Sequence, residues 1–206
     1  MAKGPRYRVS FRRRREGKTD YKARKALLLS DKPRLVTRGS LKNMSAQIVM
    51  AKLGGDEVIV SSHSRELTSK YGWKGPTGNL PAAYLTGFVC GARAKAEGVT
   101  DAILDLGLQS PTKNARVFAA LKGVLDAGIH VAHSEEKLPD EGRIEGQHIV
   151  GYAEALVSSP DKYRRRFSQY LRQKLPPENV SKHFAEVKRQ IAASMERGNI
   201  EGGNET

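Results

Sequence analysis

Polar and apolar residues alternate along the chain after residue 33. Residues 34–38 (RLVTR) have the alternation of a short strand, and residues 39–43 (GSLKN) have the composition of a turn. Residues 43–52 place four apolar side chains on one side at a period of two: Met44, Ala46, Ile48 and Met50. A pair of glycines then predicts a turn before a third strand at residues 57–62. The pattern therefore predicts an antiparallel meander of three strands.

The pattern becomes helical after residue 62. A short helix is predicted over residues 63–72, and the clearest helix over residues 79–98. Asn79 is suited to cap the start of this second helix, and Gly98 is suited to end it. Gly87 and Gly91 lie on the helix four residues apart, which indicates close packing of the helix on the sheet rather than a ligand site.

An apolar strand at residues 99–107, an amphipathic helix at 110–128 and a short strand at 129–132 complete the core. A meander followed by alternating helices and strands predicts the α/β class, in an α+β-like form with a mixed sheet and helices packed on it. The core domain is predicted to span residues 26–132.

The remaining residues, 133–206, predict a C-terminal extension that is mainly helical. Residues 134–146 are polar and typical of a loop, and residues 147–158 favour a short helix. Residues 161–175 place Tyr163, Phe167, Tyr170 and Leu171 on one helical face, and residues 181–198 do the same with Phe184, Val187, Ile191 and Met195.

Charge changes this picture at the N-terminus. Residues 1–25 contain 11 Lys or Arg against 2 Asp or Glu, and residues 161–189 contain 9 against 3, out of a net charge of +14 for the whole chain. The rest of the chain is close to neutral. Residues 1–25 have no apolar periodicity, so we expect an extended tail that a polyanionic partner orders.

Several classes of protein are disfavoured. Cys90 is the only cysteine, so neither an intrachain disulfide nor a cysteine-based zinc site can form. No apolar run approaches the roughly 20 residues of a membrane-spanning helix, and the N-terminus has no signal core, so the cytoplasm is the expected location. We expect no membrane partner, no small-molecule substrate and no cofactor.

Candidates for catalysis are few. Asp101 and Asp105 lie on one side of a predicted strand, where paired carboxylates would suit a magnesium-dependent nuclease. His130 and His133 are three residues apart, with Glu135 and Glu136 nearby, but a strand edge and a loop explain them equally well. We therefore predict no enzyme, no catalytic residue and no metal site, and keep the nuclease as a minor alternative.

Nucleic acid is the favoured partner. The guanidinium plane of arginine binds phosphate oxygens and stacks on bases, and the Tyr and Phe residues among the arginines can stack on unpaired bases. RNA offers such bases in loops and bulges. A DNA-compacting architectural protein is the second alternative.

Several stretches of the chain resemble a known family. They are GPRYRVSFRRRREGKTDYKAR, KPRLVTR followed by AQIV, YGWKGPTGNLPAAYLTG, LDLGLQSPT and VFAALKGVLDAG, together with HFAEVKR near the C-terminus. The chain resembles the archaeal form of the large-subunit ribosomal protein family L-eighteen. Bacterial members match only about residues 20–131 and have an Asp-Arg-x-Gly signature where this chain has Asp105-Leu106-Gly107.

The resemblance implies a mixed α/β domain that binds 5S rRNA through the basic tail and the sheet region. It also implies attachment of that RNA to 23S rRNA in the central protuberance, beside neighbouring ribosomal proteins that include the other 5S-binding protein. The predicted RNA-binding residues of the tail are Lys3, Arg6, Tyr7, Arg8, Phe11, Arg12, Arg13, Arg14, Arg15, Lys18, Tyr21, Lys22, Arg24 and Lys25.

The predicted RNA-binding residues outside the tail are Arg34, Arg38, Lys42, Asn43, Lys70, Trp73, Lys74, Arg164, Arg165 and Arg166. Trp73 has two interpretations. It either anchors its glycine-rich loop in the body of the protein, as large aromatic side chains usually do, or stacks on RNA while Lys70 and Lys74 bind phosphate.

Overall fold

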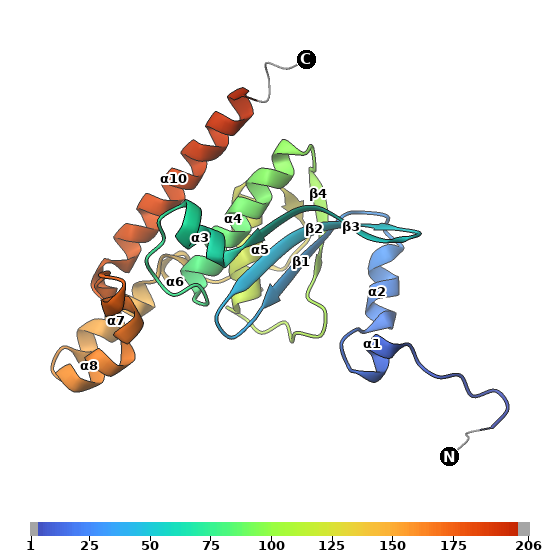
Figure 1. Cartoon of the computed structure of the whole chain (residues 1–206), viewed down its shortest axis with the longest axis horizontal. Coiled ribbons are helices and arrows are strands. Elements are labelled where there is room, and N and C mark those ends of the chain that lie inside the picture. The colour runs from blue at the N-terminus through green and yellow to red at the C-terminus, as the bar shows by residue number, and fades with distance from the viewer. Residues whose placement is uncertain (1–3, 202–206) are drawn as a thin grey trace.

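The computed structural model describes the backbone of residues 4–201 and the side chains of residues 4–195. Its centre is a five-stranded sheet in the order β3-β2-β1-β4-β5 (Figure 1). The strands are β1 (Arg34–Gly39), β2 (Met44–Lys52), β3 (Gly55–His63), β4 (Asp101–Asp105) and β5 (His130–Val131). The first three pair antiparallel, and β4 joins β1 and β5 in parallel. The predicted meander and the mixed α/β class are confirmed.

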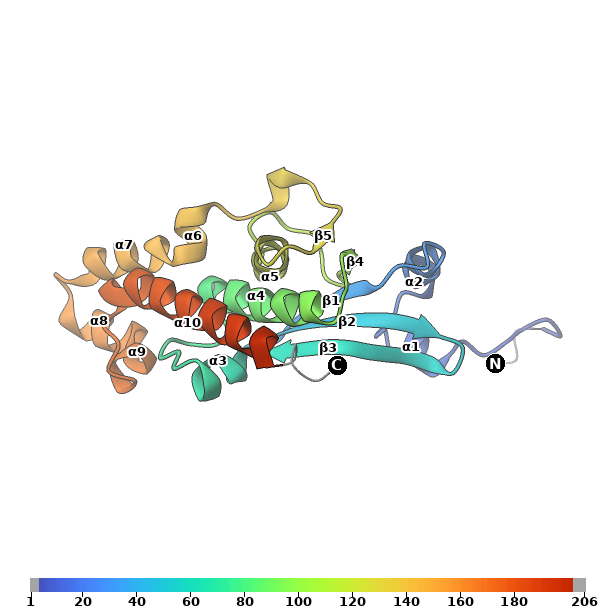
Figure 2. The same ribbon diagram turned by 90° about the horizontal axis from the view of Figure 1, so that it is seen from above.

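Residues on one side of this sheet build the core. Leu35 pairs in register with Ile48, which pairs in turn with Val60, and all three are buried. A bulge interrupts the pairing of β2 with β3 next to Ile48, and the hairpin continues beyond the end of α4 (Leu80–Ala96) (Figure 2). Met50 lies on this uncovered part of β2, so it is only half-buried, although the alternation predicted a core position.

Two helices cover the core side of the sheet. The first, α4, packs against β2 and β3, and α5 (Arg116–Asp126) packs against β1. Asn79 caps α4 by accepting a hydrogen bond from the Ala82 N–H, as predicted. A shorter helix, α3 (Ser64–Lys70), has a capping box formed by His63 and Glu66.

Glycines set the distance between α4 and α5. A Cβ atom added to Gly87 of α4 would lie 1.9 Å from the backbone oxygen of Ala120, and one added to Gly123 of α5 would lie 2.2 Å from that of Tyr84. Gly91 approaches Val124 of α5 in the same way. The expectation that Gly87 and Gly91 pack on the sheet is therefore wrong, because they pack against the backbone of the neighbouring helix.

The C-terminal extension lies at the end of the sheet away from the N-terminus (Figures 1 and 2). Its elements are the 3-10 helix η1 (Glu135–Lys137), α6 (Glu141–Glu145), α7 (Gln147–Leu156), α8 (Pro160–Arg166), α9 (Ser168–Arg172), the 3-10 helix η2 (Pro177–Asn179) and α10 (Val180–Glu201). The extension is mainly helical, as predicted, and Phe184, Val187 and Ile191 of α10 are buried.

Two details of the extension differ from the prediction. Residues 134–146 were expected to be a loop, but they contain η1 and also α6, in which the buried Ile144 fixes a helical turn. The single helix expected over residues 161–175 divides into α8 and α9 at Phe167. This break leaves Leu171 exposed, while Phe167 and Tyr170 stay in the core.

The N-terminal segment is not wholly extended. Residues 4–11 have no regular structure apart from a turn, but α1 (Arg12–Arg15) and α2 (Tyr21–Leu28) are helices. Asp20 caps α2 by accepting hydrogen bonds from the Lys22 and Ala23 N–H groups. The extended tail was the wrong prediction for these two stretches. In α2 a cap followed by good helix formers stabilises helix without apolar periodicity, and α1, which has no side-chain cap, is a single turn of arginines, which are good helix formers.

The close approach of α4 and α5 generates a prediction for Gly87→Ala. The added methyl group would force the α5 backbone away, so the free energy of unfolding should fall by about 1–3 kcal/mol, although alanine favours helix. Gly151→Ala in α7 is the matched control, because nothing lies within 4 Å of its Cβ position. Urea unfolding followed by circular dichroism measures both. Equal stability of the two variants would contradict the packing described here.

Candidate RNA-binding surface

Residues 4–28 are here called the N-terminal arm, and contacts within the arm connect its residues 11–21. The Nε of Arg13 donates a hydrogen bond to the Thr19 hydroxyl at 2.8 Å, and the ring of Phe11 lies 5.2 Å from that of Tyr21. Glu16 forms ion pairs with Arg12 and Lys18 at 2.8 Å. The arm therefore has a defined shape between residues 11 and 28.

The arm exposes its cationic and aromatic groups to solvent. No residue of α1 or α2 is buried, and the α1 helix consists of four arginines. Phe11 is 71% exposed, so its ring is accessible from solvent. Phosphate binding by the guanidinium groups and base stacking by the aromatic rings are both possible on this surface.

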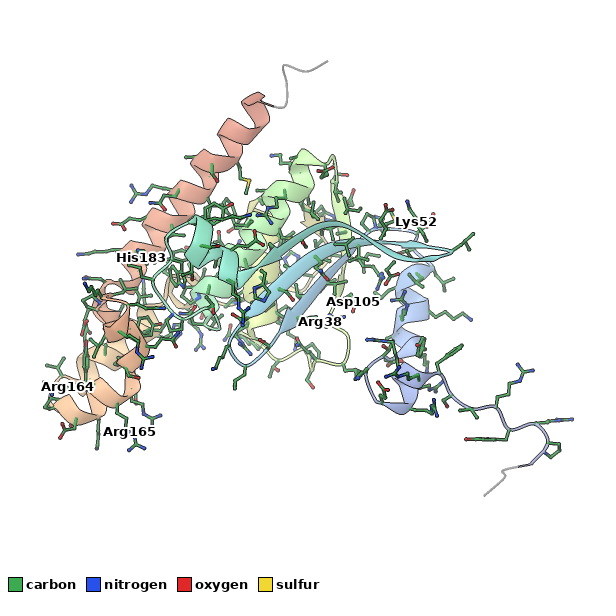
Figure 3. All side chains as sticks on the ribbon, viewed as in Figure 1. Arg38, Lys52, Asp105, Arg164, Arg165 and His183 are labelled. Carbon is green, nitrogen blue, oxygen red and sulfur yellow. The ribbon has the colours of Figure 1, made fainter. Side chains whose placement is uncertain are left out.

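A chain of ion pairs joins the arm to the sheet. Arg24 of α2 donates two hydrogen bonds to Asp56 of β3, from Nη1 at 3.0 Å and Nη2 at 2.7 Å. Arg34 of β1, only 2% exposed, donates to Asp56 at 2.7 Å and to Asp105 of β4 at 2.8 Å. Arg38 donates to the second carboxylate oxygen of Asp105 at 2.8 Å and to its backbone oxygen at 2.6 Å (Figure 3).

Gly107 supplies a further hydrogen bond to Asp105. Its N–H donates to the Asp105 carboxylate at 2.9 Å, and its φ of +62° belongs to the left-handed region that favours glycine. A Cβ at this position would also lie 2.9 Å from Nη2 of Arg38. The left-handed backbone therefore favours glycine at this turn, and a side chain here would also displace the Arg38 guanidinium.

The ion pairs change the titration of both carboxyl groups. The hydrogen bonds from Arg24 hold the pKa of Asp56 below its usual value. Burial pushes the pKa of Asp105 upwards, but the hydrogen bond and charge of Arg38, the Gly107 N–H and the charge of Arg34 together lower it. Because both folded-state pKa values lie below the unfolded value of about 3.9, this stabilisation is present above that pH. It is lost as the pH falls through the folded-state values.

The face of the sheet opposite α4 and α5 is open and forms a groove with the arm. Residues that alternate with the core positions line it, among them Val36 and Arg38 of β1 and Gln47 and Val49 of β2. Tyr21 and Leu27 of α2 lie across the groove, which has a volume of about 1130 Å³. Cationic, aromatic and apolar groups thus meet on one concave surface, which suits a nucleic acid better than a small charged metabolite.

A second cationic surface lies in the C-terminal extension. Arg164, Arg165 and Arg166 of α8 are exposed, and the first two project from the end of the molecule away from the arm (Figure 3). The two cationic surfaces are therefore far apart on the protein.

Comparison with known proteins agrees with this geometry. The family model described as "Ribosomal large subunit proteins 60S L5, and 50S L18" matches residues 5–101 and 94–134. The chain is 51% identical, over 191 residues, to the large ribosomal subunit protein uL18 of Methanothermobacter thermautotrophicus, covering 93% of this chain and 98% of the relative. The chain belongs to this family. It is a protein of the large ribosomal subunit, as the sequence resemblance implied.

The structure separates the predicted RNA-binding residues into accessible and inaccessible ones. Most of those in the arm are exposed, but Lys3 lies outside the described residues. Arg34 and Trp73 are buried and have no surface to offer an RNA, so both are corrected to structural roles. Arg24 and Arg38 are partly exposed but paired with carboxylates.

Four further predicted residues lie at the opposite end of the strands: Lys42, Asn43 and Lys74 are on loops, and Lys70 ends α3. The backbone oxygen of Lys42 and the side chain of Asn43 accept hydrogen bonds from Thr77, which leaves the Lys42 ammonium exposed. Lys70 forms a 3.3 Å ion pair with Glu66. Lys74 is exposed, and its N–H donates to the ring of His183 at 3.0 Å.

Trp73 is the anchor of the loop that connects α3 to α4. Its indole is 0% exposed, stacks on the ring of His183 with centroids 5.2 Å apart, and donates to the Pro76 oxygen at 3.3 Å. Of the two interpretations made from the sequence, the structure supports the anchor.

Sequence reasoning missed the residues that organise this surface. Asp56 was part of a predicted turn, and Arg116, which donates to the backbone oxygens of Ser40 and Gly78 at 2.9 Å, was placed only within a helix. Their partners lie 22 to 76 residues away in the sequence. No local pattern signals contacts of that range.

The paired carboxylates proposed for a nuclease do not form a metal site. Asp105 is held by Arg34 and Arg38, while Asp101 lies 3.0 Å from the ring of exposed His130. Among the residues that the structure describes, no three His, Cys, Asp or Glu side chains are grouped so as to hold a metal ion. Nor does any helix in that part of the chain combine the length and apolarity needed to cross a bilayer.

These contacts predict different outcomes for two aspartates of one strand. Asp105→Asn removes a buried charge from Arg34 and should lower the free energy of unfolding by about 3–5 kcal/mol. Asp101→Asn, at an exposed pair, should leave the unfolding midpoint unchanged. Thermal unfolding at neutral pH measures both variants. Similar stability of the two would contradict a structural role for Asp105.

The anchor role of Trp73 predicts that Trp73→Ala lowers the free energy of unfolding by about 3–5 kcal/mol, because a large buried side chain is removed. Leu41→Ala, on an adjacent exposed turn, is the control and should be neutral. Circular dichroism during urea unfolding measures both. In the wild-type protein, iodide should not quench the tryptophan emission; strong quenching would show that the indole is accessible.

Proposed function

We propose that the protein binds 5S rRNA through the N-terminal arm and the open face of the sheet. By this proposal it helps to attach 5S rRNA to 23S rRNA in the central protuberance of the large subunit, beside neighbouring ribosomal proteins that include the other 5S-binding protein. The family is one of cytoplasmic ribosomal proteins, which is not a class of enzymes.

One observation carries the proposal: an ordered, exposed arm with a helix of four arginines borders a groove on the uncovered face of the sheet. The body of the chain is nearly neutral and the arm is strongly basic, so the arm attracts a polyanion electrostatically. The Phe11 and Tyr21 rings beside the arginines favour RNA over duplex DNA, because unpaired bases are available for stacking mainly in RNA.

The separation of the two cationic surfaces supports a bridging role. The arm lies at one end of the protein and Arg164 and Arg165 at the other (Figures 1 and 3). A single protein with two such surfaces can contact two RNA segments at once, which joins them at a high effective concentration. By this proposal the arm contacts 5S rRNA, and the arginines of α8 contact a different RNA segment.

Deletion of residues 1–25 tests the proposal. The body should stay folded, because no residue of α1 or α2 is buried, while affinity for 5S rRNA should fall steeply. If about six basic residues of the full-length protein engage phosphates, its affinity should fall on the order of a thousandfold between about 50 and 200 mM salt. The truncated protein should have a shallower salt dependence.

Filter binding of 5S rRNA at several salt concentrations measures both proteins, with thermal unfolding as the control for folding. Duplex DNA as a competitor at fixed salt distinguishes the architectural alternative. Competition by DNA as effective as that by 5S rRNA would contradict 5S-specific binding, and full affinity of the truncated protein would move the main site away from the arm.

A further inference from the structure

Apolar burial does not fix the position of the N-terminal arm on the body. Every residue of α2 is at least partly exposed, and its side chains line a groove rather than a closed core. A short helix held in this way would be free to rotate unless a directional contact holds it. The arm therefore needs a specific polar contact to have one orientation.

The pair of Arg24 with Asp56 is such a contact. Its two hydrogen bonds join both terminal nitrogens of the guanidinium to both oxygens of the carboxylate, a geometry that fixes direction as well as distance. The Arg24 side chain is 33% exposed and that of Asp56 is 31% exposed, so solvent screens the pair only in part.

Asp56 is itself held by the body of the protein. Arg34 donates to the same carboxylate at 2.7 Å, and Arg34 is locked in turn by Asp105. The orientation of α2 is thus connected through two buried or half-buried ion pairs to the central strands β1 and β4.

We infer that Asp56 is a positioning residue for RNA binding: through Arg24, its carboxylate holds the arm at the angle at which the arm and the open sheet face contact one RNA together. The inference rests on the proposed function. A carboxylate at the edge of a polyanion-binding groove repels phosphate, so its electrostatic effect alone is unfavourable. Its contribution to binding is the orientation of α2.

The inference predicts a change in RNA affinity that is opposite in sign to the change expected from charge alone. Asp56→Asn removes one negative charge beside the groove, and charge alone would tighten RNA binding. We expect instead about tenfold weaker binding of 5S rRNA, because the arm no longer has a fixed orientation. The amide oxygen of Asn can still accept from Arg34, so the core should stay folded.

Glu57→Gln is the matched control. Glu57 is the next residue of β3, and it forms an exposed ion pair with Lys52 and none with the arm. Its substitution removes the same charge from the same hairpin, so 5S rRNA affinity should be unchanged or slightly higher. Asp56→Glu keeps a carboxylate and should recover most of the wild-type affinity.

Salt dependence separates positioning from a general loss of structure. If the arm leaves the RNA, the slope of log K against log salt should become shallower by roughly 0.7 to 0.9 for each phosphate that the arm no longer neutralises. Filter binding over a salt series gives affinity and slope for the wild type, Asp56→Asn, Asp56→Glu and Glu57→Gln. Thermal unfolding of the same samples reports folding.

The outcomes distinguish this inference from the proposed function. No 5S rRNA binding by the wild type would overturn the proposed function. Wild-type binding with equal or tighter binding by Asp56→Asn would overturn the inference and leave the proposed function intact. Weaker RNA binding by Asp56→Asn with an unchanged slope of log K against log salt would also count against positioning, because the arm would still make its phosphate contacts.

A second pair of variants tests the orientation of the arm without RNA. Arg24→Gln breaks the contact from the side of the arm and leaves Asp56 paired with Arg34, so it can be used even if Asp56→Asn does not fold. Lys22→Gln removes the same charge and also one trypsin site from α2, without affecting the pair. Trypsin should cleave the arm several-fold faster in Arg24→Gln than in Lys22→Gln. Equal cleavage rates of these two variants would overturn the inference.

Discussion

The buried guanidinium of Arg34 is the group on which the open side of the sheet depends. A charge removed from water is tolerated only when carboxylates and hydrogen bonds replace its hydration, and Arg34 obtains them from Asp56 on β3 and Asp105 on β4. These two strands lie on opposite sides of β1 in the sheet. Arg34 therefore links the antiparallel hairpin to the parallel strand pair, and Arg24 extends the same chain to α2.

The two faces of the sheet are stabilised by different forces. On the core face, glycines let α4 and α5 approach at backbone distance, and apolar side chains supply the stability. On the open face, ion pairs hold the strands and leave a groove uncovered. A surface kept open by polar contacts can admit a charged ligand without first exposing an apolar core.

Much of the fold could be predicted from the sequence because its signals are local. The alternation of β2, the cap at Asn79 and the apolar stripe of α10 each depend on neighbouring residues, and the predicted meander and helices followed from them. The break at Phe167 and the burial of Ile144 could not be predicted, because tertiary contacts decide them. The short helices of the arm were missed because neither has a periodic apolar pattern: α2 depends on a cap at Asp20, and α1 is one turn of arginines.

The candidate site was predictable only where charge remains exposed. An arginine that binds phosphate and one that pairs with a distant aspartate are identical in the sequence, and Arg34 lies 71 residues from its partner Asp105. The structure distinguishes them by burial. Carboxylates neutralise Arg34 and Arg38, whereas Arg14 and Arg15 have no carboxylate partner among the described residues. Among the described residues, Arg12 is the one arginine of α1 with an ion pair, to Glu16. The positive charge of α1 therefore exceeds the negative charge beside it, and a phosphate backbone would supply the missing counter-charge.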